Sequence, residues 1–138
     1  MQRTGAANKL IVAALLIAGL INFAPIVGVL SVEQLERLYE VPLSNDDLII
    51  LMRHRAVLFG MLGAFIIYSA FRESLQILAC VAGLVSMVSF IILAYASGEF
   101  GPALNKVIIA DVIGSLALVL VLFIRFRSAP SRGSRQSE

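Results

Sequence analysis

Three ionisable side chains stand side by side in an otherwise apolar stretch, LIILMRHRAVLFG at residues 48–60: Arg53, His54 and Arg55. Charged side chains inside a membrane helix are costly, and they normally face the bundle interior, a water-filled cavity or the lipid headgroups. A single histidine with no neighbouring cluster of Cys, His or carboxylate ligands is a poor metal signature. The triplet therefore indicates a polar cluster within a membrane helix, and we expect neither a metal nor another cofactor.

The composition favours a membrane protein. The chain has 138 residues, of which 59% are hydrophobic and 14% are charged, and its mean hydropathy is +0.94. A soluble domain of this length has too little interior to bury so much apolar surface. The basic residues flank apolar runs without interleaved aromatic residues, so a nucleic-acid partner is not expected. Cys80 is the only cysteine and can close no internal disulfide.

Four apolar runs predict an all-α integral membrane four-helix bundle, with spans at about residues 10–30, 48–71, 75–97 and 107–124. At about 1.5 Å per residue these runs reach roughly 27 to 36 Å, enough to cross a hydrocarbon core of about 30 Å. The first run is long and lacks an A-x-A site, so we interpret it as an uncleaved span and not a signal peptide. We assign residues 1–128 to one domain and predict that the polar residues 129–138 form a disordered cytoplasmic tail.

The basic residues predict the orientation. Seven of the 11 lie on one side of the predicted bundle: Arg3, Lys9, Arg72, Arg125, Arg127, Arg132 and Arg135. An excess of Lys and Arg marks the cytoplasmic side, so both termini are expected in the cytoplasm of a cell whose inner (plasma) membrane holds the protein. On the other side, SVEQLERLYEV predicts a short amphipathic helix between spans one and two, capped by Ser31 and Gln34. This helix lies either on the outer membrane interface or in an exposed loop.

An arginine in the second span needs a partner, and the fourth span offers Asp111 at a similar depth from the same membrane surface. Ala56, Gly60, Gly63 and Ala64 form a stripe of small residues suited to close helix packing. At about 100° per residue, Arg53 lies on that stripe and Arg55 on the far side, where it could reach the headgroups. We therefore expect Arg53 to face inward and to contact Asp111.

Other polar residues fall in the same outer half of the bundle. The predicted polar cluster comprises Asn22, Arg53, His54, Arg55, Asp111 and Ser115. Three interpretations stay open for the arginines: a structural ion pair between spans two and four, a ligand pocket, or simple reach to the headgroups without pairing.

The segment LYEVPLSNDD…RAVLFGMLGAFIIYSAFRESLQ resembles small four-span bacterial membrane proteins of the DUF4345-like group, which are broadly related in architecture to the DoxX-like proteins. The matching features are Tyr39–Val41, Arg55–Ala56, the glycines 60 and 63, and Ala70 with Arg72. The resemblance covers most of residues 35–115. It implies a four-span fold, it favours Arg55 as the characteristic arginine, and it implies no established biochemical activity.

Enzymatic activity is not expected, because the chain contains no P-loop, GxGxxG, HExxH, GxSxG or CxxC motif. Two classes of function remain besides contact with the lipid bilayer. The protein either binds or carries a small lipophilic ligand in the outer polar cluster, or serves as a non-catalytic membrane subunit that packs with itself or with a membrane partner. A pocket lined by Asn22, Arg53 and Asp111 would favour the first, and a buried Arg–Asp pair without a cavity would favour the second.

Overall fold

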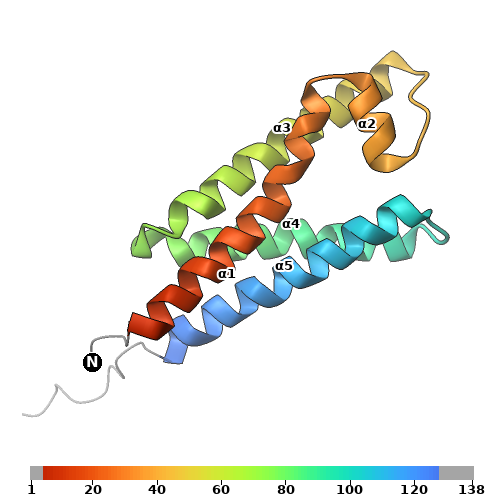
Figure 1. The fold of residues 1–138 in the computed structure, drawn as a ribbon. Helices are drawn as coiled ribbons and strands as arrows, with labels where there is room; N and C mark the ends of the chain where they lie inside the picture. Colours follow the sequence, from red (N-terminus) through yellow and green to blue (C-terminus); the bar gives the residue numbers. More distant parts are fainter. Residues whose placement is uncertain (1–4, 128–138) are drawn as a thin grey trace, which may run out of the picture.

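The computed structural model describes residues 5–127, and every regular element in this part of the chain is helical (Figure 1). The elements are α1 (Gly5–Phe23), the 3-10 helix η1 (Ala24–Val29), α2 (Val32–Tyr39), α3 (Asp46–Ser69), the 3-10 turn η2 (Glu73–Leu75), α4 (Gln76–Ala96) and α5 (Pro102–Arg127). Four long apolar helices packed as a bundle, with a short helix between the first two, confirm the predicted fold class. The tail predicted at residues 129–138 lies outside the described residues.

Much of the exterior of the bundle is apolar. Within residues 5–127, four segments are long and apolar enough to cross a membrane: Gly5–Val29, Asp46–Ser69, Glu73–Ala96 and Pro102–Arg127. Only 22% to 33% of the residues in the apolar window of each segment are buried, so large side chains such as Leu20, Met61 and Leu116 point away from the protein. Apolar surface on this scale requires a lipid environment, and the helices are embedded in a bilayer.

The four long helices form a closed ring in which α1 packs on α3, α3 on α4, α4 on α5, and α5 back on α1. Figure 1 shows α1 crossing in front of α4, with α3 on one side of it and α5 on the other. Ile11, Leu15, Ile66, Met87 and Leu118 are fully buried where these helices meet. In this ring α3 and α5 lie diagonally opposite each other, and each packs on both α1 and α4.

The helices α1 and α3 approach most closely where two glycines meet. A Cβ atom on Gly63 would lie 2.5 Å from the backbone nitrogen of Phe23 and 2.7 Å from the carbonyl oxygen of Gly19. Gly60 and Ala56 continue the same buried face of α3, whereas Ala64, the fourth member of the predicted stripe, is exposed. The small residues therefore let two helix backbones pack in contact, as is common in membrane bundles.

Helix α2 folds back over one end of the bundle, which we call the α2 end. Its first residue follows Ser31, whose Oγ accepts a hydrogen bond from the Gln34 backbone N–H at 3.3 Å, as the predicted cap requires. Leu35 and Tyr39 are buried in a small cluster against α3 and α5. The apolar face of α2 therefore packs against the protein itself, and only its charged face points outward.

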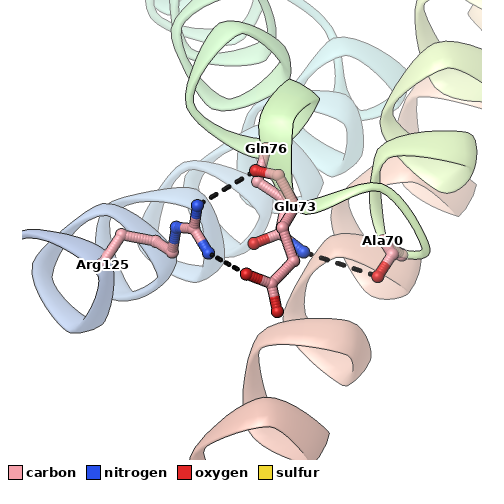
Figure 2. Close-up of polar contacts among 4 residues, drawn as sticks. All are labelled: Ala70, Glu73, Gln76 and Arg125. Carbon is pink, nitrogen blue, oxygen red and sulfur yellow. Dashed lines mark hydrogen bonds and ion pairs between the residues drawn. The ribbon is translucent and has the colours of Figure 1, made fainter. Parts of the chain in front are cut away.

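An arginine ties the helices together at the opposite end (Figure 2). Arg125 of α5 donates from Nη1 to Glu73 Oε2 at 3.2 Å and from Nη2 to the carbonyl oxygen of Glu73 at 3.0 Å. Next to it, Gln76 Nε2 donates to the Ala70 carbonyl oxygen at 3.5 Å. Because Glu73 lies in the turn between α3 and α4, these contacts fix the end of the last helix to the middle of the chain.

Candidate functional site

An open cavity of about 360 Å³ lies at the α2 end and is lined by α1, η1, α2, α3 and α5. The pocket forms where α2 spans the space between the α1–α3 pair and α5, which separate toward this end (Figure 1). Residues from all five elements contribute to its wall, among them Asn22, Pro25, Tyr39, Arg55, Ala110 and Asp111. The cavity is therefore largely apolar with a few polar groups, as is typical of small-ligand sites.

Arg55 is the central cation of this cavity. Its guanidinium carbon lies 4.8 Å from the ring centre of Phe59, 5.0 Å from that of Phe90 and 5.5 Å from that of Tyr39. These rings come from α3, α4 and α2, so three elements together hold one side chain. Such contacts attract a cation to the ring faces, and the planar guanidinium stacks well on them.

Asp111 lies on α5 in the wall of the same cavity and is half-buried. The Arg55 guanidinium attracts the Asp111 carboxylate across the cavity. Within residues 5–127, however, no ion pair of 4.0 Å or less joins the two side chains. The cavity wall therefore carries a guanidinium and a carboxylate that do not form an ion pair with each other.

The other predicted polar residues take different positions. Asn22 is buried in the cavity wall, where its Nδ2 donates to the Ala18 carbonyl oxygen at 3.3 Å. Ser115 lies one turn beyond Asp111 on α5 and donates from Oγ to Met87 Sδ at 3.7 Å. His54 is exposed on the outer side of α3 and is not part of the cavity wall.

Arg53 does not occupy the place that the helical wheel assigned to it. Its side chain is half-buried away from the cavity, and its Nε has no hydrogen-bond partner among the residues that the structure describes. No ion pair with Asp111 is formed in this part of the chain. The reason is geometric, because the small-residue face of α3 packs on α1 and η1, whereas α5 lies diagonally across the ring.

The mouth of the cavity is charged. Lys106 Nζ lies 3.7 Å from Glu40 Oε1, and both side chains are largely exposed; Arg37 also reaches this rim. Beneath them, burial raises the pKa of the Tyr39 phenol, because removal from water disfavours the phenolate. Tyr39 is therefore a neutral hydroxyl at the inner edge of a charged entrance.

Sequence reasoning missed the three rings around Arg55. A signal for one of them was present, since Phe59 follows Arg55 by four residues and lies on the same helix face. Tyr39 and Phe90 come from other helices, and no local pattern connects them to Arg55.

Comparisons with known proteins identify no relative. No family model matches the chain, and neither a curated protein nor a solved structure matches it. No group of three or more His, Cys, Asp or Glu side chains that could hold a metal ion occurs in the described segment 5–127. What the fold and the comparisons together support is a small four-span membrane protein without an identified family.

Proposed function

We propose that the protein binds or carries a small lipophilic ligand in the cavity at the α2 end. The observation that carries this proposal is that Arg55 and Asp111 line one cavity of about 360 Å³ without forming an ion pair. This volume lies within the range of about 300–1,000 Å³ for small-molecule sites. A ligand with an apolar body and one polar end matches a pocket with a largely apolar wall and a guanidinium that forms no ion pair within residues 5–127.

The cavity also weighs against a purely structural role for these charges. A structural ion pair would bring the two side chains together and exclude space around them, because an unpaired buried ion is costly. The arrangement observed keeps a cation on three aromatic rings and leaves its hydrogen-bonding groups available to a ligand. The alternative is a non-catalytic subunit that packs with another membrane protein. This role does not account for the cavity.

The proposal includes an orientation and a family. The excess of basic residues at the end that holds Gly5 and Arg127 supports cytoplasmic termini, which would open the cavity toward the extracytoplasmic side. Reporter fusions at Gly98 and after Arg127 should then report opposite sides of the inner membrane, and the same side for both would contradict this orientation.

Membership of the DUF4345-like group accords with the place of Arg55, the arginine that this resemblance favours.

A cavity-filling variant tests the function directly. Ala110 lines the cavity, whereas its neighbour Ile109 is exposed on the outside of α5. The protein would be extracted in native lipid and its retained small molecules identified by mass spectrometry. We expect one lipophilic compound to accompany the wild type and Ile109→Phe and to be lost from folded Ala110→Phe. Equal retention in both variants, or no retained compound in the wild type, would contradict the proposal.

A further inference from the structure

A second cavity adjoins the first on the other side of Arg55. It has a volume of about 220 Å³ and lies between α2, α3, α4 and the start of α5. Its wall is apolar and includes Leu35, Leu43, Met52 and Leu104. Arg55 and Tyr39 belong to the walls of both cavities, so the guanidinium stands at the boundary between a cavity that carries several charged groups and one whose other lining residues are all apolar.

We propose that the ligand is a single-chain amphiphile with one carboxylate, whose head group binds Arg55 in the first cavity and whose hydrocarbon chain occupies the second. This inference rests on the proposed function and adds the chemical class of the ligand. It also assigns a separate chain-binding site, formed by α2, α3 and α4, that the first cavity alone does not indicate.

The charges around the first cavity favour a carboxylate over other head groups. A guanidinium presents paired N–H groups that match the two oxygens of a carboxylate. The wall carries three cationic side chains, Arg37, Arg55 and Lys106, against the two acidic ones Glu40 and Asp111, so a head group with one negative charge balances it better than one with two. The rings of Tyr39, Phe59 and Phe90 hold the guanidinium in place before the ligand arrives, which lowers the cost of ordering it.

The second cavity favours a flexible hydrocarbon chain. Its lining offers almost no hydrogen-bonding group except Arg55 and Tyr39 at the boundary. Each CH₂ group that moves from water into such a wall strengthens binding by about fourfold. A single unbranched chain suits an apolar space of this size, and Arg55 and Tyr39, which line both cavities, join this space to the head-group site.

The head group is tested with three probes of equal chain length: dodecanoate, dodecanol and dodecyl phosphate, each radiolabelled. Binding to the full chain in nanodiscs would be measured at alkaline pH and corrected with empty nanodiscs. We expect saturable binding of dodecanoate, weaker binding of dodecyl phosphate, and binding of dodecanol that is at least about tenfold weaker than that of dodecanoate, because the alcohol keeps the chain but lacks the charge. Arg55→Gln should weaken dodecanoate binding at least about tenfold, as expected for loss of a charged hydrogen-bonding partner. Arg53→Gln, an arginine two residues away that lines neither cavity, should leave it unchanged.

The chain site is tested by filling the second cavity. Leu104→Trp should weaken dodecanoate binding at least about tenfold, the loss expected from two excluded CH₂ groups, but leave butanoate binding as in the wild type. Met52→Phe narrows the same space from α3 and serves if the first variant does not fold.

Unchanged dodecanoate binding in these variants would overturn the chain site, and equal binding of dodecanol would overturn the head-group assignment. If the wild type retains a native compound that Ala110→Phe loses, yet binds none of the three probes, the proposed function stands and the ligand class inferred here is wrong.

Discussion

Replacing Arg55 with Gln should destabilise the folded bundle by about 2 kcal/mol. The magnitude comes from three ring contacts, with the guanidinium carbon 4.8 to 5.5 Å from the ring centres. A cation–π contact contributes about 0.5–1 kcal/mol at a partly hydrated site, and three that share one cation contribute less than their sum. The variant also removes the positive charge that faces Asp111 across the cavity.

The assay is reversible unfolding in mixed micelles with increasing sodium dodecyl sulfate, followed by circular dichroism because the chain has no tryptophan. Arg53→Gln is the matched control, since it removes an arginine from the same helix turn. We expect that control to change stability by less than about 0.5 kcal/mol, because the Nε of Arg53 makes no hydrogen bond within the described residues.

A double-mutant cycle identifies which arginine acts on Asp111. Arg55→Gln and Asp111→Asn should show a coupling energy of about 1 kcal/mol, below the value for a direct buried pair, because the cavity separates the two charges. The cycle of Arg53→Gln with Asp111→Asn should be additive. Coupling in the Arg53 cycle together with additivity in the Arg55 cycle would refute the placement of these side chains.

Three further changes test other parts of the fold. Gly63→Ala should lower the free energy of unfolding by about 2–3 kcal/mol in the same assay, because the added Cβ meets the backbone of α1. The control Gly101→Ala has open space around it and should lower the free energy of unfolding by less than about 0.5 kcal/mol. Arg125→Gln should cost about 1 kcal/mol and Glu73→Gln less, because the second variant keeps the hydrogen bond to the carbonyl; equal losses in thermal unfolding would contradict this reading. The pKa of the Tyr39 phenol should lie above its ordinary value of 10.0 in the folded protein. The contribution of the neutral phenol to the free energy of unfolding is therefore complete below pH 10.0, and stability falls as the pH rises further. Tyr39→Phe should abolish this fall in a pH series of unfolding measurements.

Much of the architecture follows from local sequence signals. Long apolar runs predict spans because backbone polar groups in lipid must be satisfied within each helix. The hydroxyl of Ser31 three residues before Gln34 predicts the start of α2. The spacing of Gly60 and Gly63 predicts the face on which α3 packs closely against another helix. Each of these signals involves residues close together in one helix, and the geometry of that helix alone fixes their relative positions.

The composition of the site depended on information that no single helix carries. The helical wheel placed Arg53 on the packing face of α3, where the small residues lie, but it could not show that this face meets α1 and not α5. That choice depends on the order of helices around the ring. Likewise, α2 folds back and brings Tyr39 to Arg55, and α4 brings Phe90, so the aromatic surroundings exist only after three elements have packed.

The closed ring of helices has a consequence for biosynthesis. The last span, α5, packs on both α1 and α4, and it supplies one wall of the cavity around Arg55. At roughly 5–20 residues per second, a ribosome needs about 1 to 5 seconds to make its 26 residues. During that time the first three spans already carry an arginine whose neighbouring wall is missing. A nascent chain therefore carries Arg55 on its aromatic rings before Asp111 and the α5 wall of the cavity are in place.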